Sequence, residues 1–135
     1  MAQILIADSD EDIARSWGRA LRSCGHSCTI VHSGYETRIL LEASTYDLLI
    51  AEALMPKGSG VLLAILREAL FPNVKVLLVA SDVNFAQWLD DDHTTEGAEK
   101  VLSKPIDINA LFSVVSDLLK DQEYDPVLPL LRSYH

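Results

Sequence analysis

Short, continuous apolar runs alternate with segments of helical periodicity along most of this chain. The apolar runs lie at residues 4–7, 28–31, 48–51, 74–80 and 100–103. Runs of this length without polar interruption are typical of strands that are buried on both faces. Each run is followed by a segment whose apolar residues recur at helical spacing. These segments lie at residues 11–24, 33–43, 60–70, 82–89 and 107–120.

Five strands that alternate with five helices predict an α/β fold with a doubly wound parallel sheet covered on both faces. Local signals agree with these bounds, because Asp10 is a good N-cap for the first helix and Gly25 a good terminator. The helix at residues 82–89 is the weakest of the five, since it runs into the acidic residues 90–92. In such sheets, functional side chains gather at the carboxyl ends of the strands.

The composition of the chain excludes several classes of function. The chain has 135 residues, 49% of them hydrophobic and 23% charged, which is typical of one globular domain. Its net charge of −9 argues against nucleic-acid binding. No apolar run approaches the ~20 residues that span a bilayer, and the N-terminus lacks a basic flank, so we expect a cytoplasmic protein. Cys24 and Cys28 are too few to form a metal site, and Cys28 begins a predicted buried strand.

Candidate functional residues follow four of the five predicted strands. Because the carboxyl ends of parallel strands share one edge of the sheet, we expect these residues to lie close together. They are Asp8, Ser9 and Asp10 after the first strand, Glu52 after the third, Ala80 and Ser81 at the end of the fourth, and Lys104 and Pro105 after the fifth.

Four motifs in this order match one known family. The first strand reads Ile-Leu-Ile-Ala-Asp, and the third reads Tyr-Asp-Leu-Leu-Ile-Ala-Glu, with Leu-Met-Pro at residues 54–56. Gly60 lies four residues beyond Pro56, and Lys104-Pro105 precedes the last helix. Over residues 3–120 the chain resembles the receiver domains of two-component response regulators. The resemblance implies a flavodoxin-like, CheY-like fold of five strand–helix repeats, and a cis peptide bond before Pro105.

The resemblance also implies a phosphoryl-transfer site. In receivers, an acidic residue at the end of the third strand accepts a phosphoryl group from a histidine kinase. That residue and two acids after the first strand hold Mg²⁺, which neutralises the developing charge. The family's Mg²⁺ positions fall on Asp8, Ser9, Glu52 and Leu54, and its phospho-acceptor position falls on Glu52.

Two further family roles concern the phosphoryl oxygens. A hydroxyl at the end of the fourth strand and a lysine after the fifth strand bind these oxygens in receivers. The hydroxyl position falls on Ala80, with Ser81 beside it, and the lysine is Lys104. Neighbouring strand residues point to opposite faces, so Ser81 is a doubtful replacement. The aromatic residue that reports phosphorylation in relatives corresponds to Val101.

Three departures from the family pattern weaken phosphoryl chemistry. Ser9 is a poor Mg²⁺ ligand, Ala80 has no hydroxyl, and Glu52 is one methylene longer than aspartate. The extra methylene displaces the attacking oxygen by ~1.5 Å, and a shift of about 1 Å can cost ~100-fold in rate. We expect Lys104 to pair with Glu52 and the site to lack Mg²⁺, other cofactors and enzymatic activity.

The sequence therefore favours an atypical receiver, a pseudo-receiver, that acts as a phosphorylation-independent protein-interaction module. The alternative is a working receiver that accepts a phosphoryl group from a histidine kinase with Mg²⁺. The expected partner is a signalling protein, either a histidine kinase or a downstream effector, at the face formed by the fourth helix, fifth strand and fifth helix. A homodimer through that face stays open. Residues 1–120 are the predicted receiver domain, and residues 121–135 a C-terminal tail or linker.

Overall fold

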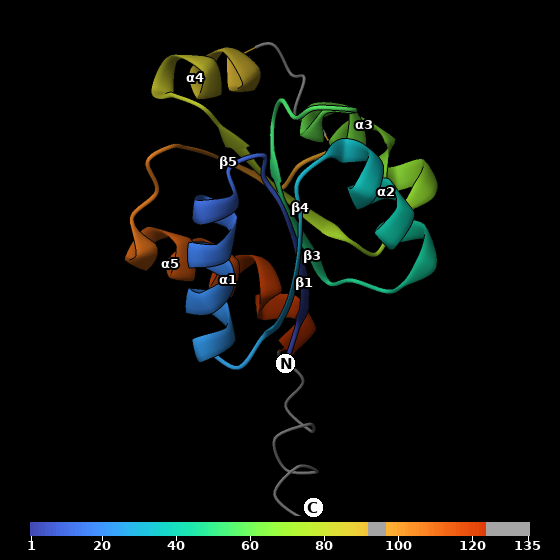
Figure 1. Ribbon diagram of the computed structural model, residues 1–135, viewed down its shortest axis with the longest axis vertical. Helices are drawn as coiled ribbons and strands as arrows, with labels where there is room; N and C mark the ends of the chain where they lie inside the picture. The colour runs from blue at the N-terminus through green and yellow to red at the C-terminus, as the bar shows by residue number, and fades with distance from the viewer. Residues whose placement is uncertain (92–96, 124–135) are drawn as a thin grey trace, which may run out of the picture.

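A five-stranded parallel sheet forms the centre of the protein, with helices on both faces (Figure 1). The computed structural model describes residues 1–91 and 97–123. The strands are β1 (Gln3–Ala7), β2 (Ser27–Val31), β3 (Leu48–Glu52), β4 (Lys75–Ala80) and β5 (Lys100–Ser103), in the spatial order β2-β1-β3-β4-β5. The helices are α1 (Glu11–Ser23), α2 (Gly34–Ala43), α3 (Gly60–Leu70), α4 (Val83–Asp91) and α5 (Ile108–Glu123). The predicted α/β fold is confirmed.

The ends of the elements differ from the predicted bounds by at most three residues. The largest difference is at α5, which continues to Glu123 and so includes the first three residues of the predicted tail. The weak helix at residues 82–89 is present, and α4 ends at Asp91. Asp92 and residues 124–135 lie outside the described residues, so the predictions for them are untested.

The local signals at the ends of α1 act as the sequence predicts. The Asp10 side chain accepts hydrogen bonds from the backbone N–H groups of Asp12 and Ile13, which caps the N-terminus of α1. At the other end, Gly25 has a φ of 93°, a left-handed conformation that favours glycine after a helix. These two residues therefore mark the start and the end of α1.

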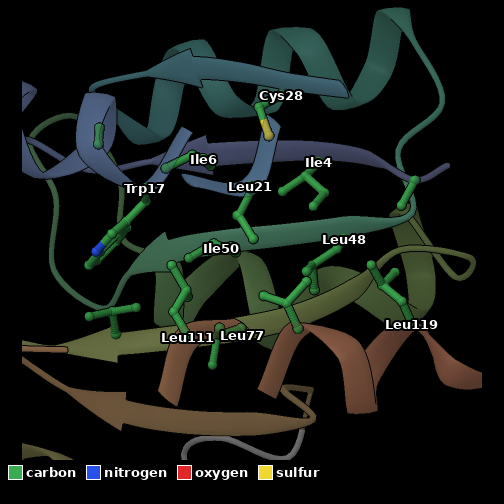
Figure 2. Packing of buried hydrophobic residues seen from close by; sticks show 14 residues of the cluster. Ile4, Ile6, Trp17, Leu21, Cys28, Leu48, Ile50, Leu77, Leu111 and Leu119 are labelled. Carbon is green, nitrogen blue, oxygen red and sulfur yellow. The ribbon is translucent and has the colours of Figure 1, made fainter. Parts of the chain in front are cut away.

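The hydrophobic core lies in two layers because successive strand residues point to opposite faces of the sheet. On one face, Ile4, Ile6 and Leu111 of α5 pack with Trp17 of α1 (Figure 2). On the other face, Leu5 and its neighbours pack beneath α2 and α3. Figure 1 shows α1 and α5 on one side of the sheet and α2 and α3 on the other.

The carboxyl ends of β1 and β3 form a switch point in the path of the chain. These two strands are adjacent, with Ala7 opposite Ala51, yet the chain leaves β1 toward α1 and leaves β3 toward α3. Because α1 and α3 cover opposite faces, the two loops diverge, and such a switch point is where α/β sheets bind ligands. Asp8 and Glu52 lie at this point.

Candidate functional site

The ammonium group of Lys104 lies between two carboxylates at the carboxyl edge of the sheet. Lys104 Nζ donates to Glu52 Oε2 at 2.8 Å and to Asp8 Oδ1 at 3.1 Å. Asp8 Oδ2 is 2.9 Å from the same nitrogen. The cluster is shielded from water, since 16% of the Lys104 side chain, 14% of Glu52 and none of Asp8 is exposed. One positive charge therefore serves two negative charges in a largely desolvated position.

Ser9 completes the contacts of the Glu52 carboxylate. The Ser9 hydroxyl donates to Glu52 Oε1 at 2.6 Å, and the Ser9 backbone N–H donates to the same oxygen at 3.3 Å. Both carboxylate oxygens of Glu52 are thus engaged, one by Ser9 and the other by Lys104. The Glu52 side chain thus connects the end of β3 to the loop after β1.

Asp8 is held from several directions. The backbone N–H of Asp10 donates to Asp8 Oδ1 at 2.9 Å, and the backbone N–H of Asp8 donates to the carbonyl of Val31 on β2. His32 Nδ1 lies 2.9 Å from the Asp8 carbonyl. Asp8 Oδ2 is buried and accepts no hydrogen bond from the described residues, so the charge of Lys104 is what stabilises it. The Asp8 carboxylate is therefore held by the backbone of Asp10 and by the ammonium group of Lys104.

The three charged groups shift one another's pKa values in directions that follow from these contacts. Burial raises the pKa of Asp8, and hydrogen bonds from Asp10 and Lys104 only partly oppose it. Burial by itself would raise the pKa of Glu52, but hydrogen bonds from Lys104 and Ser9 lower it overall. Burial would lower the pKa of Lys104, yet hydrogen bonds to Glu52 and Asp8 raise it. Glu52 and Lys104 are consequently held in their charged forms.

The position that bears a hydroxyl in relatives offers none here. Ala80 is fully buried and packs against Ala53 and Leu89. Its backbone carbonyl accepts a hydrogen bond from the Lys104 N–H, which brings the end of β5 to the site. Ser81 is exposed. Val101, at the position of the family's reporting aromatic residue, is half-buried against the Ala80 cluster.

The donor set does not fit the Mg²⁺ ion of the family's sites. Mg²⁺ requires close to six oxygen ligands in octahedral geometry. Here both carboxylates already accept hydrogen bonds from Lys104, and Ser9 directs its hydroxyl proton at Glu52. Within residues 1–91 and 97–123, no group of three His, Cys, Asp or Glu side chains could hold a metal ion. Leu54, whose family role is a Mg²⁺ position, has an exposed side chain in the loop after β3.

Sequence reasoning placed most of these residues and missed one role. The expected contact of Lys104 with Glu52 is present, as is the cis peptide bond at Lys104-Pro105. The sequence predicts Ser9 only as a poor metal ligand, whereas in the structure it is the main hydrogen-bond donor to Glu52 Oε1. The sequence feature that indicates this role is the hydroxyl of Ser9, which follows Asp8 at the end of the first strand. Cys24 is exposed and Cys28 buried, and no disulfide joins them.

The fold and the arrangement of residues at the sheet edge define a receiver domain. The sequence profile of the response regulator receiver domain matches residues 4–116, and the chain belongs to this family. Receiver domains act in two-component signalling and interact with histidine kinases or downstream effectors. No helix in the described part of the chain is long and apolar enough to span a bilayer.

Several known proteins are similar to this chain. It is 28% identical over 119 residues to the response regulator receiver protein CpdR of Brucella abortus, covering 88% of this chain and 98% of CpdR. It is 26% identical to the transcriptional regulatory protein GlrR of Escherichia coli, covering 88% of this chain and 26% of GlrR.

Two solved structures have similar sequences and folds. The receiver domain of the Francisella response regulator 1452 has a TM-score of 0.79 at 25% identity, covering 91% of this chain and all of that one. A receiver domain from Bermanella marisrubri has a TM-score of 0.74 at 28% identity, covering 87% of this chain and 97% of that one.

Proposed function

We propose that this receiver domain transmits signals by binding a partner protein, without being phosphorylated. The observation that supports this most is the closed set of contacts around Glu52. Both oxygens of its carboxylate accept hydrogen bonds within the protein, from Ser9 and from Lys104. A carboxylate attacks phosphorus through one of these oxygens, and the hydrogen bonds from Ser9 and Lys104 lower the nucleophilicity of the carboxylate and fix its direction, so they oppose phosphoryl transfer. The domain is therefore held in one arrangement of its site.

Three further features support the proposal. The methylene added at Glu52 displaces the carboxylate by ~1.5 Å, enough to misplace a nucleophile for in-line transfer. Ala80 supplies no hydroxyl for a phosphoryl oxygen, and Ser81 is exposed. Lys104, which would bind such an oxygen, is already shared by Asp8 and Glu52. A buried ion pair of this kind specifies one local arrangement better than it adds stability.

A direct test is incubation with acetyl phosphate and Mg²⁺, followed by intact-mass measurement. We expect no mass gain for the wild-type chain. The matched positive control is the triple variant Ser9→Asp, Glu52→Asp and Ala80→Thr, which restores the family's residues and should gain one phosphoryl group. A phosphoryl group found on Glu52 of the wild-type chain would establish the alternative, a working Mg²⁺-dependent receiver.

The proposed binding face is formed by α4, β5 and α5. Trp88 on α4 is 54% exposed and stacks on Phe85, with ring centroids 6.0 Å apart, and Val83 is 69% exposed. Large exposed aromatic groups are frequent anchors in protein interfaces. The partner would be a histidine kinase, a downstream effector or a second copy of the chain. Sedimentation of the wild type and of Trp88→Ala tests the last of these, because a dimer through this face would be weakened by the substitution.

A further inference from the structure

An apolar cavity of about 580 Å³ lies next to the charged site, between α1, the end of β4 and the segment that joins β5 to α5. Its apolar wall is formed by Ile13, Trp17, Pro105, Ile106 and Ile108. Figure 1 shows α1 and α5 on the same side of the sheet. Residues of both helices line the cavity. The volume falls within the ~300–1,000 Å³ range of small-molecule sites.

The cavity is open to solvent and carries few polar groups. Asp12, Ser16 and Ser81 contribute its polar wall, and all three residues are exposed. Trp17 is only 4% exposed, so its ring forms an inner wall and is otherwise covered by the core. A ligand here would contact apolar side chains on its inner side and hydroxyl or carboxylate groups near the entrance.

The charges around the cavity select against anions. Lys104 is the cation on its wall, but its ammonium group is bound to Asp8 and Glu52. Together with Asp12, these groups comprise three carboxylates and one ammonium. Asp10, the N-cap of α1, and Glu11, in its first turn, add to the negative potential around the cavity. A neutral or cationic ligand is therefore favoured.

We propose that this cavity binds a small aromatic amine. The aromatic rings would pack against Trp17 and Ile106, and the N–H group would donate to the Asp12 carboxylate or to a serine hydroxyl. Such a ligand needs no phosphoryl chemistry, so this proposal rests on the function proposed above and supplies an input for it. Lys104 and Pro105 line the cavity, and Lys104 also holds Asp8 and Glu52. Filling the cavity would therefore act on the charged site through this shared segment.

The neutral amine N-phenyl-1-naphthylamine is a suitable probe, because its fluorescence rises in apolar surroundings. When the probe itself is excited, its fluorescence should rise on titration with the wild-type chain and saturate at one bound probe per molecule. Ser16→Phe places an aromatic ring in the cavity from an exposed position. It should raise the dissociation constant of the amine at least about tenfold. Ile108→Trp should have the same effect from the opposite wall. Ser113→Phe, at an exposed serine of α5 away from the cavity, should bind as the wild type does.

Two further measurements complete the test. The sulfonate 1-anilinonaphthalene-8-sulfonate, a related ring system with a negative charge, should bind more weakly than the neutral amine. Saturating amine should shift the backbone amide resonances of Ser9 and Glu52, which do not line the cavity. Absence of saturable binding, equal binding by Ser16→Phe, or unchanged Ser9 and Glu52 resonances would overturn the proposal. None of these outcomes bears on whether Glu52 accepts a phosphoryl group, which the mass measurement decides separately.

Discussion

At the scale of single residues, Glu52 acts as a fixed charge. Its carboxylate is held by Ser9 on one oxygen and by Lys104 on the other. Lys104 in turn is the source of positive charge for the fully buried Asp8, whose Oδ2 has no hydrogen-bond donor among the described residues. Removing the lysine would consequently leave two carboxylates close together with no compensating cation.

Replacing Lys104 by methionine should therefore lower the free energy of unfolding by about 3 kcal/mol, the effect of leaving a buried charge without its partner. Urea unfolding at neutral pH measures this loss. Arg38→Met is the matched control, because Arg38 and Glu42 form an exposed pair on α2 with side chains 54% and 57% accessible. Arg38→Met should lower the free energy of unfolding by less than about 0.5 kcal/mol. Equal losses in the two variants would contradict the description of the Lys104 cluster.

Acid should remove the contribution of Glu52 to stability. Burial alone would raise the pKa of Glu52, but hydrogen bonds from Lys104 and Ser9 lower it below its ordinary value of 4.5. The unfolded chain thus takes up the proton first as the pH falls, so this contribution is complete above pH 4.5 and declines below it. Asp8 acts in the opposite sense, because burial raises its pKa.

Urea titrations of the wild type and of Glu52→Gln at several pH values separate the Glu52 contribution from that of Asp8. The difference in free energy of unfolding between the two proteins should shrink below pH 4.5. A difference that stayed constant through this range would show that Glu52 is not preferentially ionised in the folded state.

At the scale of elements, the start of α3 positions Glu52. Gly60 begins this helix, and a Cβ atom added there would collide with the backbone carbonyl of Glu52 and lie 3.1 Å from Ala51 Cβ. The backbone N–H of Val61 donates to the carbonyl of Ala53 at 3.2 Å. This glycine, a motif residue in the sequence, is thus required by close approach of α3 to the end of β3.

Gly60→Ala should lower the free energy of unfolding by about 1–3 kcal/mol, because neither backbone can move aside freely. It should also shift the amide resonances of Glu52 and Ser9. Gly18→Ala is the control, since the one close contact of a Cβ atom there would be with the flexible end of the Ile30 side chain, 2.9 Å away. Alanine is favoured within a helix by up to ~1 kcal/mol, so this change should be close to neutral. Comparable destabilisation by both changes would contradict the special role of Gly60.

At the scale of the whole molecule, net negative charge opposes compaction. The chain carries 20 acidic and 11 basic residues, giving −9 at neutral pH. Repulsion among unpaired surface carboxylates destabilises the folded state, and dissolved salt screens it over a Debye length of about 8–10 Å. Stability should increase from low to physiological ionic strength, whichever simple salt provides the ions.

Mg²⁺ should add nothing beyond this screening. At matched ionic strength, MgCl₂ and NaCl should give the same urea midpoint, apart from the modest additional screening that a divalent ion causes at any acidic surface. Specific binding with a dissociation constant of 1 mM would instead add about 1.4 kcal/mol at 10 mM Mg²⁺. The triple variant that restores the family's residues is the control, and it should show such an increase. A similar increase in the wild-type chain would mean that Asp8 and Glu52 hold the metal.

The sequence by itself determined the number, order and approximate bounds of the strands and helices. Hydrophobic periodicity and caps such as Asp10 are local properties, readable over a few residues. It also located Asp8, Glu52 and Lys104 at one edge of the sheet, because parallel strands bring their carboxyl ends together. The continuation of α5 beyond residue 120 was not predictable, since helix ends depend on weak local preferences.

Only the tertiary structure decided how those residues bond to one another. The hydrogen bond of Ser9 with Glu52 joins positions 43 apart, and that of Lys104 with Asp8 joins positions 96 apart. Distances of this kind depend on strand register and loop paths, which leave no local pattern in the sequence. The same holds for Trp17, 4% exposed against the core, and Trp88, 54% exposed on α4. Both lie on helices, and only packing distinguishes the buried ring from the exposed one.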